Sequence, residues 1–369
     1  MRILHFYRTY FPDTFGGIEQ VIYQIAEKSS FLGVETKVLT LSANPKGRIA
    51  FPHHEVHQAK LGMQIASNGF SWQVFGAFRS LAETVDVIHY HYPWPFMDLV
   101  HFATGCKKPS VVTYHSDIVR QRNLLKLYAP LQKAFLRSVD RIVVTSPNYL
   151  ESSSTLQNYR QKTDVIPIGL DESMSIPADE NVVASWRAKL PPKFFLFVGV
   201  LRYYKGLDVL LAAMRENDCP VVIVGGGPEE SRLRALAQQW NLQNIYFLGE
   251  LPDLDKNALL TLCYGVVFPS NLRSEAFGIS LLEGAMFGKP MISCEIGTGT
   301  TFINLQGETG LVTLPDDSKA FSDAMRFLWD NPDKASEMGR AARHRYVQHF
   351  TADKMADSYC RIYHELAGK

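Results

Sequence analysis

Short apolar segments alternate with amphipathic helical segments along almost the whole chain, and this alternation restricts the fold more than any other feature. It is typical of parallel sheets that are covered by helices on both faces. One sheet is expected from strands at residues 2–7, 35–41, 85–89, 110–114, 141–145 and 163–167. A second sheet is expected from strands at residues 194–201, 220–224, 245–248, 265–268, 290–294 and 310–314. The sequence therefore predicts an α/β protein with two doubly wound, Rossmann-like domains that face each other across a cleft.

The division between the two domains is expected in the polar, proline-bearing stretch 169–180, which has the composition of a linker. We assign residues 1–170 to an N-terminal domain, residues 171–351 to a C-terminal domain and residues 352–369 to a final helix. With 369 residues and a hydrophobic content of 46%, the chain is large enough to bury two cores.

Charge and cysteine content argue against several classes of protein. The formal net charge of +1 gives no overall field that would attract nucleic acid, so no nucleic-acid partner is expected. No signal peptide is visible, and the apolar run 194–201 is far too short to span a bilayer, so any membrane contact is expected to be peripheral. The cysteines have neither metal-binding nor redox spacing and fit a reducing cytoplasm; they are Cys106, Cys219, Cys263, Cys294 and Cys360.

The most informative functional feature is a pair of glutamates, Glu275 and Glu283, on a predicted strand-loop-helix unit. Glu275 lies in the loop after strand 265–268, and Glu283 lies on the helix that follows. A carboxylate on the helix can bind a ribose diol, and one in the loop can bind sugar hydroxyls beyond a diphosphate. The first N–H groups of such a helix attract phosphate, and they belong here to Phe277, Gly278 and Ile279. The pattern indicates a sugar-nucleotide site.

Two cations, Arg202 and Lys205, follow directly on the predicted strand 194–201. Because ligands bind at the carboxyl ends of strands in open parallel sheets, both cations can reach the crevice beside Gly278. Together with the two glutamates, they resemble the retaining glycosyltransferases of family 4. The resemblance covers nearly the whole chain, and its further motifs are Gly16-Gly17, Tyr114-His115-Ser116-Asp117, Ile166-Pro167-Ile168-Gly169 and Gly307-Glu308-Thr309-Gly310.

The resemblance implies the two-domain GT-B fold and roles for residues of the N-terminal domain. Gly16 and Gly17 would contact phosphate or acceptor at a helix start, as the second glycine does in family members. His115 would hydrogen-bond a hydroxyl of the donor sugar and stabilise developing positive charge, with Asp117 as an orienting neighbour. The resemblance also implies that the final helix crosses back to the N-terminal domain.

In the C-terminal domain, the resemblance places Glu275 at hydroxyls of the transferred sugar, away from the anomeric carbon. Front-face attack with retained configuration is therefore favoured over a double displacement, which needs a carboxylate nucleophile at that carbon. Arg202, Lys205 and the helix terminus near Gly278 can neutralise the leaving diphosphate, so neither a metal nor another cofactor is expected. The expected activity is that of a metal-independent, retaining hexosyltransferase.

The segment 202–208, taken with 297–300 and the motif at Gly307, resembles an O-antigen mannosyltransferase-like subgroup. GDP-mannose is therefore the first choice of donor, and UDP-linked galactose, glucose or N-acetylhexosamines stay open. The expected acceptor is a lipid-linked oligosaccharide of bacterial O-antigen or polysaccharide synthesis. The expected location is the cytoplasm, at the inner face of the plasma membrane.

Residues 118–139 form a basic amphipathic segment without a single acid. Such a surface suits anionic lipid headgroups, so this segment is expected to dock on a membrane, although a solvated helix face has the same pattern. The aromatic stretch 92–97 is expected to lie beside it. The basic residues are Arg120, Arg122, Lys126, Lys133 and Arg137.

Two motifs with other possible readings are set aside. The glycine run 225–227 follows a strand, but the third glycine of a dinucleotide fingerprint would fall on Glu230, so the run is interpreted as a bend beside the nucleoside. Asp253 and Asp255 have the spacing of a metal-diphosphate motif. Because Asp255 precedes a helical pattern, it is interpreted as a helix cap.

Three other functional classes stay open. A sugar-nucleotide epimerase or hydrolase could use the same two-domain plan, but an epimerase would interconvert free nucleotide sugars without an acceptor. A non-catalytic scaffold would not need the two cations and two glutamates together. A nicotinamide-dependent oxidoreductase is disfavoured by the failed glycine fingerprint.

Overall fold

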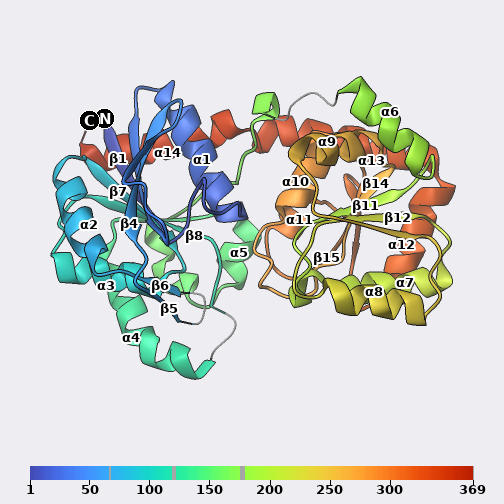
Figure 1. Ribbon diagram of the computed structural model, residues 1–369, viewed down its shortest axis with the longest axis horizontal. Coiled ribbons are helices and arrows are strands. Elements are labelled where there is room, and N and C mark those ends of the chain that lie inside the picture. The colour runs from blue at the N-terminus through green and yellow to red at the C-terminus, as the bar shows by residue number, and fades with distance from the viewer. Residues whose placement is uncertain (66–67, 119–121, 175–178, 369) are drawn as a thin grey trace. The chain divides into compact units, whose positions relative to one another are not determined.

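The computed structural model describes residues 1–65, 68–118, 122–174 and 179–368, and these form two compact units. The first unit comprises Met1–Gly169 together with Ala352–Lys369, and the second comprises Leu170–Thr351. The final helix, α14 (Ala352–Ala367), therefore belongs to the first unit, where it packs against α1 (Gly17–Ser30) (Figure 1).

The first unit contains an eight-stranded sheet in the order β10-β9-β8-β7-β1-β2-β4-β3. All neighbouring strands are parallel except β3, which runs antiparallel to β4. The strand order reverses between β1 and β7, which is the switch point where ligands bind in open α/β sheets. The strands are β1 (Arg2–Phe6), β2 (Glu35–Ser42), β3 (Arg48–Ala50), β4 (His54–Lys60), β7 (Val87–Tyr92), β8 (Ser110–Tyr114), β9 (Arg141–Val144) and β10 (Thr163–Val165).

The edge strand β3 and its neighbour β4 are missing from the sequence prediction. Strand β4 reads His-Glu-Val-His-Gln-Ala-Lys, which has no apolar run, yet His54 and Gln58 are buried. The His54 side chain is accommodated because its Nδ1 lies 2.6 Å from the Glu27 carboxylate. A buried polar pair thus replaces the apolar pattern from which strands are predicted.

Helices cover both faces of this sheet (Figure 1). Helices α1 and α14 lie on one face, and α2 (Gln73–Glu83), α3 (Pro95–Thr104) and α4 (Arg122–Ser138) lie on the other. The remaining elements are the short hairpin β5 (Met63–Ile65) and β6 (Asn68–Phe70), α5 (Pro147–Ser152) and the 3-10 helix η1 (Leu156–Lys162).

The second unit is built on a parallel six-stranded sheet in the order β13-β12-β11-β14-β15-β16. Numbered within the unit, this is the 3-2-1-4-5-6 order of Rossmann folds, whose switch point lies between the first and fourth strands. Here those strands are β11 and β14. The strands are β11 (Phe195–Val198), β12 (Val221–Val224), β13 (Ile245–Gly249), β14 (Gly265–Phe268), β15 (Met291–Cys294) and β16 (Gly310–Thr313).

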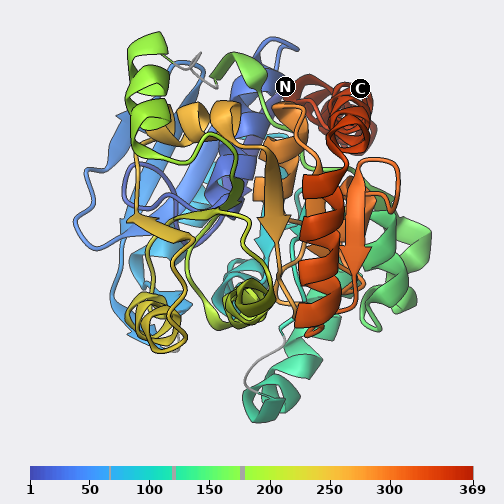
Figure 2. The same ribbon diagram turned by 90° about the vertical axis from the view of Figure 1, so that its right-hand side faces the viewer.

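The helices of the second unit form a layer on each face of its sheet (Figures 1 and 2). One layer contains α6 (Glu180–Lys189), α9 (Asp253–Leu262), α10 (Ile279–Met286) and α13 (Pro332–His349). The other contains α7 (Leu207–Ala213), α8 (Glu230–Gln239) and α12 (Ser318–Asp330). Shorter pieces are η2 (Glu172–Met174), η3 (Tyr203–Lys205), η4 (Met214–Glu216) and α11 (Thr300–Ile303).

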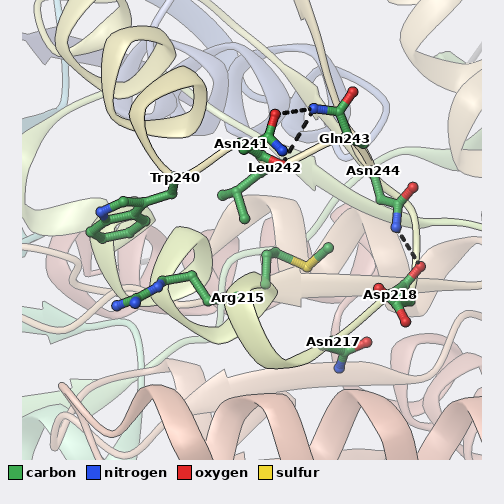
Figure 3. A pocket seen from close by; sticks show the side chains of 9 residues that line it. Arg215, Asn217, Asp218, Trp240, Asn241, Leu242, Gln243 and Asn244 are labelled. Carbon is green, nitrogen blue, oxygen red and sulfur yellow. Dashed lines mark hydrogen bonds between the residues drawn. The ribbon is translucent and has the colours of Figure 1, made fainter.

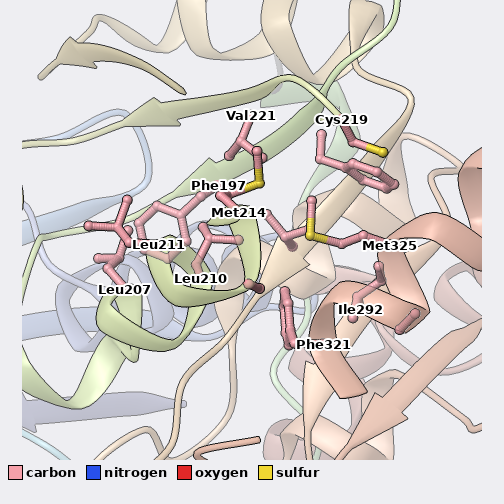
Figure 4. Packing of buried hydrophobic residues seen from close by; sticks show 14 of the residues in the cluster. Phe197, Leu207, Leu210, Leu211, Met214, Cys219, Val221, Ile292, Phe321 and Met325 are labelled. Atoms are coloured by element: carbon pink, nitrogen blue, oxygen red, sulfur yellow. The ribbon is translucent and has the colours of Figure 1, made fainter. Parts of the chain in front are cut away.

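An apolar core joins the second sheet to α7 and α12 (Figure 4). Leu207, Leu210 and Leu211 lie on one helical face and pack with Phe197 of β11. Full burial of side chains of this size stabilises the fold by roughly 1.5–3 kcal/mol each. The core therefore fixes α7 and the loop before it, which carries Arg202 and Lys205.

The predicted α/β architecture of two doubly wound parallel-sheet domains is confirmed. Eleven of the twelve expected strands begin within one residue of their predicted start, because buried parallel strands read as short apolar runs. In the described part of the chain, no helix combines the length and the apolarity needed to cross a membrane.

Candidate active site

Two loops meet at the switch point of the second sheet. The loop after β11 contains Gly206, whose φ of 66° is left-handed, and a Cβ at this position would lie 1.9 Å from the carbonyl oxygen of Pro269. Only glycine permits this approach. The Asn271 N–H donates to the Tyr204 carbonyl at 3.2 Å, so the loop after β14 is tied to the loop after β11.

This contact brings Lys205 and Glu275 together. Their Nζ and Oε2 atoms lie 2.6 Å apart, and only 12% of each side chain is exposed. The ammonium group also lies 4.9 Å from the centre of the Phe268 ring. Burial raises the pKa of the neighbouring Tyr204 hydroxyl, and the charge of Glu275 raises it further. The structure thus pairs two of the four side chains that sequence analysis expected to converge.

Arg202 lies on the same loop with an exposed side chain. Its backbone is extended, with φ −118° and ψ 155°, and it precedes the short helix η3. Its positive charge acts against the rise in the pKa of Tyr204. Arg202 is therefore a solvent-facing cation at the switch point.

Glu283 has a protein partner that the sequence analysis did not identify. It is buried on α10, and its Oε1 lies 2.7 Å from Nζ of Lys256, which also lies 2.8 Å from Asp253. Burial opposes the charge of Lys256, but the two carboxylates outweigh burial and raise the pKa of Lys256. Lys256 was missed in the sequence because it stands alone on the exposed-looking side of a helical pattern.

The metal-like spacing of Asp253 and Asp255 has a structural explanation. The Asp255 carboxylate accepts a hydrogen bond from the Trp186 indole N–H at 2.7 Å, and Asp253 pairs with Lys256. The prediction that Asp255 caps a helix from outside is wrong, because α9 begins at Asp253 and Asp255 lies in its first turn.

Helix α10 starts next to the Lys205–Glu275 pair. Gly278 precedes it with φ 101° and ψ 62°, and the Ser280 hydroxyl donates to the Val198 carbonyl at 2.7 Å, which ties the helix start to the end of β11. Phe277 is buried against Gly299, where a Cβ would lie 2.5 Å from the Phe277 ring. The first N–H groups of this helix, from Ile279 onward, provide a site for an anion.

The glycine run 225–227 is required by backbone packing. A Cβ on Gly225 would lie 2.1 Å from the Gly199 carbonyl oxygen, and one on Gly227 would lie 2.7 Å from that of Leu201. These glycines let the turn after β12 pack against the loop that leads to Arg202. The lack of a side chain at these positions, which close backbone packing requires, accounts for the motif without a dinucleotide fingerprint.

In the first unit, Gly16 precedes α1 and Gly17 is its first residue. A Cβ added to Gly16 would lie 2.5 Å from a carboxylate oxygen of Glu19. The same carboxylate accepts a hydrogen bond from the Thr14 hydroxyl at 3.0 Å. Gly16 therefore makes room for an acid at the start of the helix. Any phosphate bound by the N–H groups here has to share the site with Glu19.

His115 follows β8 and is buried. Its Nε2 lies 3.0 Å from Nδ1 of His91, and burial lowers the pKa of His115 to about 3, so its imidazole is neutral at physiological pH. Asp117 accepts hydrogen bonds from the hydroxyls of Tyr114 and Ser153, both at 2.8 Å. His91 is the orienting partner that the structure shows for His115, and sequence analysis missed it.

His91 belongs to a buried group with His5 and His89. Nitrogen atoms of these three rings lie within 4.8 Å of one another, a spacing compatible with a metal ion. However, both nitrogens of His89 already lie within hydrogen-bond distance of other groups, with Tyr363 at 2.6 Å and Thr113 at 2.7 Å. The arrangement fits a hydrogen-bonded network better than a set of ligands. The alternation of His89 and His91 along one strand is the sequence pattern that could have indicated this network.

Of two surface cavities, one lies at the amino ends of strands in the second unit and the other at the carboxyl ends of strands in the first unit. One of about 270 Å³ is lined by residues that precede β12 and β13, including Arg215, Asp218 and Trp240, and it contains none of the predicted site residues (Figure 3). Another, of about 430 Å³, lies in the first unit beyond the carboxyl ends of β1 and β2. Its polar lining residues are Arg8, Thr9, Asp13, Thr14, Ser42, Asn44 and Gln64.

The expected membrane surface is only partly supported by the structure. Arg120 lies outside the described residues, whereas Lys133 and Arg137 are exposed on α4 and Leu127 is 81% exposed. The aromatic stretch 92–97 lies beside α4 as expected, since the Gln132 side chain donates to the Tyr92 hydroxyl at 2.7 Å. Its aromatic side chains are buried, however, so the stretch adds no exposed aromatic surface for a membrane.

Comparison with known proteins identifies the family. The family model "Glycosyl transferases group 1" matches residues 179–345, and "Glycosyltransferase Family 4" matches residues 15–173. The chain is 60% identical, over 95% of its length and 93% of the relative, to D-rhamnosyltransferase WbpZ of Pseudomonas aeruginosa. The chain belongs to glycosyltransferase family 4. Its resemblance to the mannosyltransferase-like subgroup is also confirmed, since it is 50% identical to O-antigen chain mannosyltransferase C of Escherichia coli, over 99% of each chain.

Solved structures confirm the GT-B fold of this family 4 member. Sucrose-phosphate synthase from Thermosynechococcus elongatus matches with a TM-score of 0.81 at 22% identity, covering 100% of this chain and 99% of the other. The expectation that the protein is a glycosyltransferase is confirmed. The comparisons give no support to the alternative of an epimerase or hydrolase.

Proposed function

We propose that this glycosyltransferase moves D-mannose from GDP-mannose, with retained configuration and without a metal, onto a lipid-linked glycan of an O-antigen chain. The observation that carries the proposal is the Lys205–Glu275 pair at the switch point between β11 and β14, beside the start of α10. A cation, a carboxylate and a helix N-terminus at one switch point match the charges of a sugar diphosphate.

The diphosphate is assigned to Arg202, Lys205 and the first N–H groups of α10. As the bond to the sugar breaks, negative charge grows on the leaving phosphate, and these groups are already in place to stabilise it. Single preorganised donors of this kind contribute roughly 3–4 kcal/mol to the transition state. Lys205, held by Glu275 at 2.6 Å, meets the requirement of preorganisation.

The two glutamates are assigned to hydroxyl groups. One oxygen of Glu275 binds Lys205, which leaves its other oxygen to accept hydrogen bonds from the transferred sugar. Lys256 keeps Glu283 charged in its buried position, and a charged carboxylate is the better acceptor for a ribose diol. With Glu275 occupied in this way, front-face attack accounts for retention.

The first unit is assigned to the acceptor. The cavity of about 430 Å³ beyond β1 and β2 combines apolar walls with hydroxyl, amide, carboxylate and guanidinium groups, which suits a glycan. Neutral His115 is assigned to a hydroxyl of the transferred sugar, as the family resemblance implies. Gly16, Gly17 and Asp117 are assigned to the surroundings of the same ligands.

A second donor is favoured by the comparison with WbpZ, which is named a D-rhamnosyltransferase. D-Rhamnose is the 6-deoxy form of D-mannose, so the same hydroxyl contacts at the other ring positions serve both sugars. The choice between them depends on whether the site hydrogen-bonds a 6-hydroxyl, because a site built for a hydroxyl strongly rejects its deoxy analogue.

We place the reaction in the cytoplasm at the inner face of the plasma membrane, since the proposed acceptor is lipid-linked. The exposed Lys133, Arg137 and Leu127 of α4 provide the described part of an anionic-lipid contact.

Product analysis tests the proposal. The purified protein is incubated with a synthetic lipid-linked acceptor and, in parallel, GDP-mannose, GDP-D-rhamnose or UDP-glucose. Mass spectrometry and the anomeric NMR signal then identify the product. We expect a new α-linked hexose only from a GDP-sugar, and at least tenfold less with Glu275→Gln than with the control Glu216→Gln. Transfer from UDP-glucose alone would reject the donor, and an inverted linkage would reject the mechanism.

A further inference from the structure

A chain of hydrogen bonds joins three histidines beneath the carboxyl edge of the first sheet. His5 Nδ1 lies 2.9 Å from His91 Nε2, and His91 Nδ1 lies 3.0 Å from His115 Nε2. The residues come from β1, β7 and the end of β8, which run side by side in the sheet. The chain therefore leads from inside the unit to the edge where His115 is assigned to substrate.

The network is held in place by the final helix. His89 stacks on His91 with ring centres 4.3 Å apart, and its Nδ1 lies 2.6 Å from the Tyr363 hydroxyl of α14. Thr113 links the other nitrogen of His89 to Tyr359, at 2.7 and 2.8 Å. Both nitrogens of His89 thus bind groups that do not belong to the His5–His91–His115 hydrogen-bond chain, and α14 supplies Tyr363 and Tyr359 to this arrangement.

All four histidines are neutral. Burial lowers the pKa of His5 and of His115 to about 3, and it lowers the pKa values of His89 and His91 well below the ordinary value. A neutral imidazole has one donor and one acceptor nitrogen, so each hydrogen bond along the chain fixes the direction of the next.

The far end of the chain decides that direction. His5 Nε2 is buried and has no hydrogen-bond partner among the described residues. A buried N–H without a partner is rarer than an unused acceptor, so Nε2 is the bare nitrogen and the proton is on Nδ1. His5 then donates to His91, and His91 donates to His115 Nε2. The remaining proton of His115 is on Nδ1.

We propose that His91, backed by His5, is a positioning residue that holds His115 as the Nδ1–H tautomer, so that His115 offers a donor to the sugar substrate. The role in transfer rests on the proposed function. The His115 tautomer is a property of the protein alone and can be measured without substrate. Loss of His91 would release His115 Nε2, and both the tautomer and the ring position would become mixed.

The first experiment measures the tautomer. Protein with 15N-labelled histidine is observed through long-range 1H–15N correlations, and His115 is assigned from the spectrum of His115→Gln. We expect His115 to be protonated at Nδ1 in the wild type and mixed in His91→Phe. The control His101→Phe removes a buried histidine that bonds Tyr90 and Ser138 instead, and it should leave His115 unchanged. A proton on His115 Nε2 in the wild type, or an unchanged tautomer in His91→Phe, would overturn the proposal.

The second experiment measures transfer. We expect kcat to fall about 10- to 100-fold in His91→Phe with KM for the nucleotide sugar little changed, because misplacing one contacting group costs up to about 100-fold. His91→Gln, which can both accept and donate, should recover part of the loss. If the tautomer result holds but no sugar is transferred, the proposed function fails and the hydrogen-bond chain stands. If transfer occurs and His91→Phe matches His101→Phe, the positioning role fails.

Discussion

Replacing Gly206 with alanine is expected to separate the two loops that form the candidate site. The residue has a φ of 66°, and the added Cβ would lie 1.9 Å from the oxygen and 2.8 Å from the carbon of the Pro269 carbonyl. The left-handed backbone costs a non-glycine residue roughly 1–2 kcal/mol. Forcing a methyl group into packed backbone costs a further ~1–3 kcal/mol. The expected loss in the free energy of unfolding is therefore about 2–5 kcal/mol.

Gly249 provides a matched control in the same unit. Its φ of 73° is also left-handed, but nothing lies within 4 Å of the position of an added Cβ. Gly249→Ala should therefore lose only the backbone contribution of roughly 1–2 kcal/mol. The difference between the two variants isolates the contact between the loops.

Urea denaturation, followed by tryptophan fluorescence, measures both stabilities, and the initial rate of sugar transfer measures the site. Relief of the clash requires Pro269 and Gly206 to move apart, which also moves Lys205 away from Glu275. We expect kcat/KM to fall at least about tenfold in Gly206→Ala and to change less than about twofold in Gly249→Ala. Equal losses of stability and equal activities in the two variants would refute the argument.

Three further outcomes are expected. Glu275→Gln should keep its affinity for the nucleotide but lose about 10²- to 10³-fold in kcat, and an unchanged turnover number would remove Glu275 from the site. The buried histidines (His5, His89, His91 and His115) have lowered pKa values, so the unfolded state binds more protons than the folded state below pH ~6.5. The free energy of unfolding should therefore fall as the pH drops from about 6.5 towards 5, by up to about 1.4 kcal/mol per pH unit for each histidine. A free energy of unfolding that stays flat in this range would contradict the neutral network. Anionic vesicles should sediment the protein at low salt, and a Lys133→Glu, Arg137→Glu double variant should sediment less; equal recovery on neutral vesicles would argue against docking.

The parts of the fold that follow from local pattern could be predicted from sequence. Strands such as 265–268 are apolar on both faces, and the loop positions of Arg202, Lys205 and Glu275 follow from the ends of these strands. Strand β4 was missed because its buried positions include a histidine paired with Glu27, which only the folded chain brings close.

Partners that are distant in sequence could not be predicted. Glu283 and Lys256 are 27 residues apart, and their pairing depends on how α9 and α10 lie on the sheet. His5, His91 and His115 come from three strands, so their hydrogen bonds depend on the register between β1, β7 and β8. Within β7, only the alternation of His89 and His91 signals that the two rings share one face.

Nucleotide binding tests the central claim most directly. The claim is that Arg202 and Lys205 hold a diphosphate at the switch point of the second sheet. Titration of GDP by calorimetry compares the wild type with Arg202→Met, Lys205→Met and the control Arg215→Met, which lies at the amino ends of the strands (Figure 3). A charge-assisted hydrogen bond contributes about 1.5–3 kcal/mol, so Kd should rise about 10- to 150-fold for each of the first two variants and stay within about twofold for Arg215→Met. Unchanged GDP affinity in both Arg202→Met and Lys205→Met would contradict the account.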